Sequence, residues 1–178
     1  MGRAVPPGWQ EFAQQVGGEV VRARFFRPDT VLVKRVPWAI TLDTRVEAGG
    51  SPEYGSWTSD TYTRLTARYE SRDGFRFSIR PTDEFSKLGK ALGMRFELGE
   101  PDIDRRYLIK ASDEAKLRAM FANPRFGQLF RDVKYKLNFK VKGSNELCLE
   151  VPGRVADPEE LKCLLDLFTE TLAQISAA

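Results

Sequence analysis

The sequence contains no histidine. Ser/His/Asp and Cys/His catalysts and His-ligated zinc or haem sites all need an imidazole, so these mechanisms are excluded. Carboxylate, lysine, tyrosine and cysteine chemistry stays open. The chain also has no recognisable catalytic, metal-binding or cofactor motif. We therefore assign it no catalytic residue, no metal ligand and no cofactor.

Cysteine is scarce and long apolar runs are lacking. The two cysteines, Cys148 and Cys163, have no CxxC spacing, which favours free thiols in a reducing compartment. No stretch approaches the roughly 18 uninterrupted apolar residues that span a bilayer, and no apolar run follows Arg3 as an export signal requires. We expect a cytoplasmic protein without a membrane span.

The composition is that of a globular protein. The 178 residues are 42% hydrophobic, 30% charged and 11% aromatic, which is far from the signature of disorder. A chain of this length buries most of its apolar surface around one core, so we predict a single domain over residues 1–178. The net charge of +3 is too small to identify a polyanionic partner by itself.

The N-terminal half predicts one helix followed by strands. Helical spacing of apolar residues runs from Trp9 to Val16, and Gly17 is expected to end the helix. Alternation of Val21, Ala23 and Phe25 with arginines predicts a strand over 19–26. We expect further strands at 30–36, 38–42, 58–70 and 74–80, the last two forming a hairpin through the turn 71–74, and a long loop over 47–57.

The middle of the chain predicts short helices around one strand. Thr82 and the acidic pair after it begin a helix with an apolar stripe through Phe85, Leu88 and Leu92. A brief strand is expected at 107–109. Two more helices are then expected, capped by residues 112–114 and by Asn123 with Pro124 at the first helical position.

The last two predicted strands specify their own register. Residues 133–142 and 146–151 alternate between apolar and polar side chains. A two-residue turn would place Val141 opposite Glu146, so a three-residue loop over 143–145 is required. That register pairs Lys142 with Glu146, Val141 with Leu147, Phe139 with Leu149 and Asn138 with Glu150.

The final segment completes an α+β fold. Asp157 and Pro158 begin a helix with apolar residues on one face through Ile175. Short connections between neighbouring strands imply an antiparallel sheet, and helices with one apolar stripe imply that they cover one side of it. We predict a strongly curved antiparallel sheet with helices, including the long C-terminal helix, packed on one face.

Basic residues collect on the predicted solvent-facing side of the strands. Such cations can bind phosphates, yet Glu70, Glu146 and Glu150 share these faces and no exposed aromatics are interleaved with them. Binding of nucleic acid or another polyanion is therefore an alternative that we rank below the leading hypothesis. The residues concerned are Arg22, Arg24, Arg64, Arg68, Arg76, Arg80, Lys134, Lys136, Lys140 and Lys142.

Four aromatic residues flank the predicted long loop and are candidates for a ligand pocket: Trp38, Tyr54, Trp57 and Tyr62. They could line it beside Phe25 and Phe75. Burial in an ordinary core explains them equally well.

An acidic segment offers a third possibility. Glu97, Asp102 and Asp104 could hold a hard cation for a carboxylate-dependent metal enzyme. The full calcium-loop spacing is missing, which favours a solvated turn paired with Arg105 and Arg106. Cys148 is expected on the outer strand face without an acid or base partner, so it is not a candidate nucleophile.

The middle third of the chain resembles a bacterial family classed as a domain of unknown function. The resemblance rests on the stretch Leu88–Gly93, the acidic stretch Gly99–Asp104, and a strand at Tyr107–Lys110 that leads into a helix ending near Asn123. It implies an α+β fold and a bacterial source, and it brings no known activity. Some similar proteins carry membrane spans, which this sequence lacks.

These observations favour a non-enzymatic domain that binds a small ligand or another protein. The absent histidines and catalytic motifs support it, as does a sheet and long helix that could enclose an apolar pocket. The ligand or partner is not specified by any residue pattern, nor is the oligomeric state.

Overall fold

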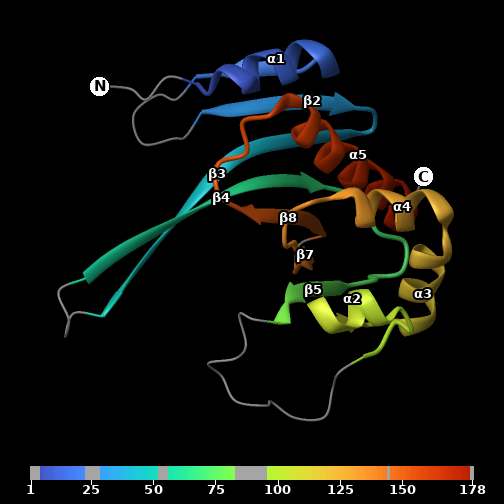
Figure 1. The fold of residues 1–178 in the computed structure, drawn as a ribbon. Coiled ribbons are helices and arrows are strands. Elements are labelled where there is room, and N and C mark those ends of the chain that lie inside the picture. Colours follow the sequence, from blue (N-terminus) through green and yellow to red (C-terminus); the bar gives the residue numbers. More distant parts are fainter. Residues whose placement is uncertain (1–4, 23–28, 52–55, 83–95, 144, 177–178) are drawn as a thin grey trace.

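The computed structural model describes residues 5–22, 29–51, 56–82, 96–143 and 145–176. Within them it contains five helices and one antiparallel sheet of eight strands in the order β1-β2-β3-β4-β8-β7-β5-β6 (Figure 1). The predicted α+β class is confirmed. The strands are β1 (Glu19–Val21), β2 (Thr30–Arg35), β3 (Trp38–Ser51), β4 (Ser56–Arg68), β5 (Phe77–Pro81), β6 (Tyr107–Ala111), β7 (Asn138–Lys142) and β8 (Glu146–Pro152); the helices are α1 (Pro7–Val16), α2 (Pro101–Arg106), α3 (Glu114–Ala122), α4 (Pro124–Asp132) and α5 (Pro158–Ile175).

Helices α1, α5, α4 and α3 form a layer over one face of the sheet (Figure 1). Helix α5 is central because its apolar side is buried along its whole length, and Phe168 stacks on Phe139 of β7. Trp9 of α1 is buried and donates its indole N–H to the carbonyl of Val155 at 2.8 Å. The core therefore lies between the helices and the inner face of the sheet, and we call the opposite side the outer face.

Local signals set the helix ends as predicted. Gly17 adopts φ 67° and closes α1 with bonds to the carbonyls of Ala13 and Gln14, a conformation that glycine reaches without steric cost. Asp113, Asn123 and Asp157 each accept backbone N–H groups at the start of α3, α4 and α5. Helix α2 was not predicted; its buried residue is Ile103.

The predicted register of the last hairpin is confirmed at every pair. Lys142 lies opposite Glu146, Val141 opposite Leu147, Phe139 opposite Leu149 and Asn138 opposite Glu150. The predicted strand 133–142 was too long, however, because β7 begins only at Asn138. The preceding residues turn toward α5, where Tyr135 bonds to Glu160.

The predicted hairpin between 58–70 and 74–80 is wrong. The β7–β8 hairpin lies between β4 and β5, so that Leu65 of β4 pairs with Leu149 while Ile79 of β5 pairs with Phe139. The connection from β4 to β5 instead passes the turn of that hairpin, with Tyr69 N–H bonded to Asn145 O at 3.1 Å. Residues 71–74 favour a turn, but a turn does not determine which strands pair. The strand neighbours are set by burial of apolar residues that lie far apart in the sequence.

The predicted loop 47–57 is mostly strand. β3 continues to Ser51 and β4 begins at Ser56, with Gly49 opposite Thr58 and Gly50 opposite Trp57. Their far ends, residues 45–51 and 56–62, leave the body of the sheet as a two-stranded extension that we call the β3–β4 ribbon (Figure 1). Cross-strand backbone bonds outweighed a glycine-rich composition that is unfavourable for strands.

The phase of the first strand was also predicted wrongly. Val20 rather than Val21 packs against the core, because Val20 lies opposite the buried Val31, and Val21 is 41% exposed. The expected strand residues Ala23 and Phe25 lie outside the described residues, as does the helix expected after Thr82. Among the residues that the structure describes, no helix has the length and apolar character needed to cross a bilayer.

Candidate functional site

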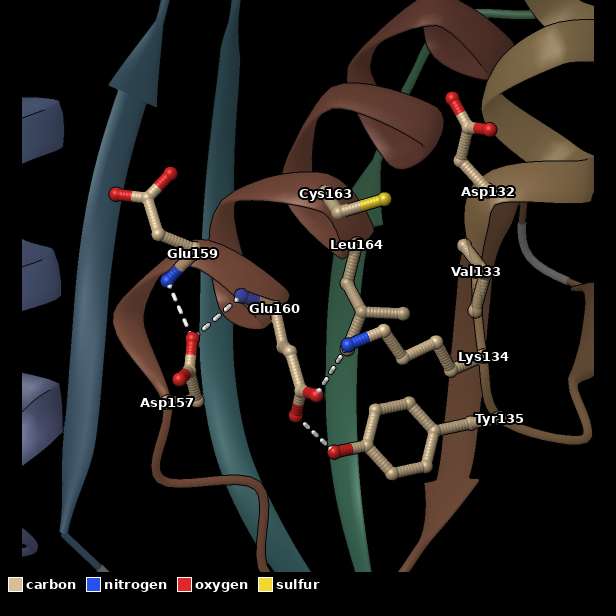
Figure 2. A pocket seen from close by; sticks show the side chains of 9 residues that line it. All are labelled: Asp132, Val133, Lys134, Tyr135, Asp157, Glu159, Glu160, Cys163 and Leu164. Carbon is tan, nitrogen blue, oxygen red and sulfur yellow. Dashed lines mark hydrogen bonds and ion pairs between the residues drawn. The ribbon is translucent and has the colours of Figure 1, made fainter.

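A cavity of about 300 Å³ opens where the chain leaves α4 and meets the first turns of α5. One wall is the segment Asp132–Tyr135 before β7. The other wall is built from Asp157, Glu159, Glu160, Cys163 and Leu164 (Figure 2). We call this cavity the α5 pocket; its volume is at the lower end of the range for small-molecule sites.

Tyr135 and Glu160 meet inside the α5 pocket. The hydroxyl of Tyr135 donates to Oε2 of Glu160, and Nζ of Lys134 lies 3.4 Å from Oε1 of the same carboxylate (Figure 2). Desolvation, reinforced by the bond to Glu160 and its charge, raises the pKa of Tyr135 to about 12. The hydroxyl therefore keeps its proton at neutral pH and donates a hydrogen bond to Glu160.

The cap of α5 orients this pair. Oδ1 of Asp157 accepts from the backbone N–H of Glu159 at 2.9 Å and of Glu160 at 3.0 Å. These bonds begin the helix with Glu160 in its first turn, on the side of the pocket. The first turn carries Glu159 and Glu160, as the positive end of a helix dipole favours.

Carboxylates dominate the charge of the α5 pocket. Asp132, Asp157, Glu159 and Glu160 line it against the single ammonium of Lys134, while Val133 and Leu164 add apolar surface. The Lys134 side chain is 77% exposed, so its ion pair with Glu160 is weakly held. The pocket is thus acidic with an apolar wall.

Cys163 is half-buried in the same pocket. Burial raises the pKa of its thiol, and the charges of Asp132, Asp166 and Glu160 raise it further. Because the thiolate is the nucleophilic form, Cys163 contributes a neutral, soft contact rather than a reactive group.

Trp38 and Tyr62, two of the four predicted pocket aromatics, do not share one site. Trp38 is the first residue of β3 and packs on the core, beside a separate hollow of about 390 Å³ that Arg68 and Tyr69 also line. Tyr62 pairs with Arg45 farther along the sheet, on the outer face, where the guanidinium lies 4.7 Å from its ring. Trp57 belongs to the β3–β4 ribbon through its backbone pair with Gly50, and Tyr54 lies outside the described residues.

The predicted basic residues differ in their exposure and in their partners. Arg64 makes two bonds of 2.7 and 2.8 Å to Asp43, which raise the pKa of the guanidinium. Lys134 faces the α5 pocket instead. Arg22, Arg68, Arg76 and Lys136 are exposed, Arg80 and Lys140 are half-buried, and Arg24 lies outside the described residues.

The outer face is less open than the alternation predicted. Cys148 is fully buried and Glu150 is only 4% exposed. Arg45 covers Glu150, with Nε 2.7 Å from Oε1. Burial raises the pKa of the Cys148 thiol. Cys148 lies on the outer strand face, as its position in the alternation predicts, but it is buried there rather than exposed.

The acidic segment stabilises its own loop. Asp104 accepts backbone N–H groups from Leu98 at 2.7 Å and Gly99 at 2.9 Å. Glu100 pairs with Arg131 at 2.8 Å, and Asp102 is exposed, as is Glu97. Within the described residues, no three His, Cys, Asp or Glu side chains come together in a group suited to a metal ion.

Tyr135 and Glu160 were missed as a site because 25 positions separate them in the sequence. One was read as a core-facing strand residue and the other as part of a helix start. The signal that could have found them is the tyrosine hydroxyl, since a tyrosine directed at a core usually finds a hydrogen-bond partner.

Comparison with protein-family models, with curated proteins and with solved structures finds no match. The resemblance noted for Leu88–Asn123 therefore stays a prediction.

Proposed function

We propose that the protein is a binding domain whose ligand is a small organic cation with an apolar body, held in the α5 pocket. The observation that carries the proposal is the acidic cavity around the Tyr135–Glu160 pair, with Val133 and Leu164 on its wall. A partly enclosed carboxylate attracts an ammonium or guanidinium more strongly than an exposed one does. The apolar wall favours an alkyl or aryl body over a bare inorganic ion.

Binding is better supported than catalysis because the pocket lacks an activated group. The pKa of Tyr135 is about 12, so its hydroxyl keeps its proton at neutral pH. Burial and neighbouring carboxylates raise the pKa of Cys163, which favours the thiol over the thiolate. A nucleophile or general base that works near neutral pH needs a pKa near the working pH or a base beside it. Polyanion binding has less support, since Arg64 is already paired with the carboxylate of Asp43.

Lys134 occupies the place that a ligand cation would take. Its ammonium lies 3.4 Å from Oε1 of Glu160 on a mostly exposed side chain. An incoming amine would replace it there and leave the Tyr135 bond to Oε2 in place. Removal of the lysine ammonium should therefore strengthen binding of a cation, whereas loss of the Glu160 charge should weaken it.

The test is an NMR titration of the whole chain with benzylamine, with benzoate as the anion of similar shape. We expect saturable shifts at the α5 pocket for benzylamine only. Glu160→Gln should weaken binding by about fivefold or more, the effect of one charge pair near a surface, and Lys134→Ala should strengthen it.

The matched control is Glu170→Gln, a carboxylate on the same helix that pairs with Arg125 away from the pocket. It should leave the affinity for benzylamine unchanged. Equal binding of benzoate, or an affinity that Glu160→Gln does not alter, would overturn the proposal.

A further inference from the structure

The β3–β4 ribbon leaves one long strand edge without a neighbour. β2 pairs with β3 only from Trp38 to Leu42. Beyond that point, in the part of the chain that the structure describes, β3 has β4 on one side and no strand on the other. An unpaired edge is a template for the addition of another strand.

The side chains on this edge have a pattern of their own. Val46 is one of the exposed large hydrophobic residues, at 59% exposure. Arg45 and Glu47 flank it on the outer face and form an ion pair of 3.2 Å, with side-chain exposures of 31% and 57%. Opposite charges thus stand on either side of an exposed apolar residue.

This pattern is complementary to itself. In an antiparallel pair, residues opposite each other point to the same side of the sheet. When two copies of one strand pair across a two-fold axis, their inner faces therefore lie on the same side only if one residue lies opposite its own equivalent at the axis. An axis at Val46 sets Arg45 opposite Glu47 of the other copy, twice, and Val46 opposite its own equivalent. An axis at Arg45 or at Glu47 would set like charges against each other, which is destabilising.

We propose that the protein forms a two-fold dimer by pairing of β3 with β3 of a second copy, centred on Val46. The two ribbons then form a four-stranded sheet. Arg45 and Glu47 of both copies make a ring of alternating charge around the axis, and the exposed valines are buried against each other. The occupant of the edge is a second copy because, with the axis at Val46, its charges complement those of this strand and its valine meets Val46.

The test uses sedimentation velocity of the whole chain over a range of concentrations. The wild type should reach twice the chain mass of 20.2 kDa. Val46→Asp and Val46→Lys should each associate at least about tenfold more weakly, because each sets like charges opposite each other at the axis. Their mixture should dimerise again, since aspartate then faces lysine.

Substitution at Val46 is suited to this purpose because the residue is exposed, so the fold should tolerate it. The matched control is Val36→Asp in the β2–β3 turn, where the valine is 93% exposed; it should leave association unchanged. A wild type that is monomeric at every concentration would overturn the proposal and leave the edge to a strand of a different protein. Folded Val46 variants that dimerise alone, or whose mixture does not, would also overturn it.

Discussion

At the scale of residues, the candidate site is defined by polar side chains that are partly shielded from water. The Tyr135 hydroxyl reaches the pocket side of its segment and bonds to Glu160. Glu150 is buried under Arg45 on the outer face. In both cases a donor lies against a carboxylate that is partly or fully shielded from water. The Tyr135–Glu160 pair lines a cavity, and this makes it a candidate site.

The raised pKa of Tyr135 predicts a stability loss in alkali. The phenol ionises near pH 10 in the unfolded chain but at a pKa of about 12 in the folded protein. Between these values the unfolded state has lost a proton that the folded state still holds, so stability falls as pH rises through this window. The contribution is fully present below pH 10.

Urea unfolding of wild type and Tyr135→Phe at several pH values between 8 and 11.5 checks this. The variant should lose less of its free energy of unfolding above pH 10 than the wild type, because phenylalanine has no proton to lose. Parallel curves for the two proteins would show that the hydroxyl is not shielded as described.

At the scale of elements, the cap of α5 holds both the helix and the pocket in place. Asp157 accepts two backbone N–H groups and also contributes charge to the α5 pocket. These two roles can be separated by substitution, since asparagine caps helices about as well as aspartate and carries no charge.

Asp157→Ala should therefore lower the free energy of unfolding by about 1 kcal/mol and weaken benzylamine binding. Asp157→Asn should keep most of the stability while still weakening binding. Chemical denaturation and the NMR titration measure the two effects. If Asp157→Asn bound benzylamine as tightly as the wild type, the charge of Asp157 would have no part in recognition.

At the scale of the whole molecule, few backbone pairs join β5 to β7, and we call this boundary within the sheet the seam. β5 joins the rest of the sheet through two residue pairs with β7, Ser78 with Lys140 and Ile79 with Phe139. β4 and β8 share six pairs in the middle of the sheet. Edge-to-face packing of Phe77 on Phe139, with centroids 5.3 Å apart, also crosses the seam.

We predict that β5 and β6 open before the rest of the sheet. Native-state hydrogen exchange should show lower protection for the amides of β5 and β6 than for those paired between β4 and β8, because fewer backbone pairs hold β5 to β7 than hold β4 to β8. Phe77→Ala should widen this difference. Uniform protection across the sheet would mean that it unfolds as one unit.

The sequence by itself determined the features that depend on neighbours along the chain. Helix caps at Asp113, Asn123 and Asp157 follow from local hydrogen bonding. The register of β7 with β8 follows from polarity matching across a short turn. Both could be predicted because all the interacting residues lie within about a dozen positions of one another.

Only the tertiary structure decided which distant segments are neighbours. The β7–β8 hairpin lies between β4 and β5 although nearly 60 positions separate it from β5 (Figure 1), and a local turn signal cannot report that. The α5 pocket depends on the same step, since it joins Tyr135 to Glu160 only after α5 packs on the sheet. Burial of apolar surface is non-directional, so the pattern of one strand shows that it needs a partner but not which partner it will have.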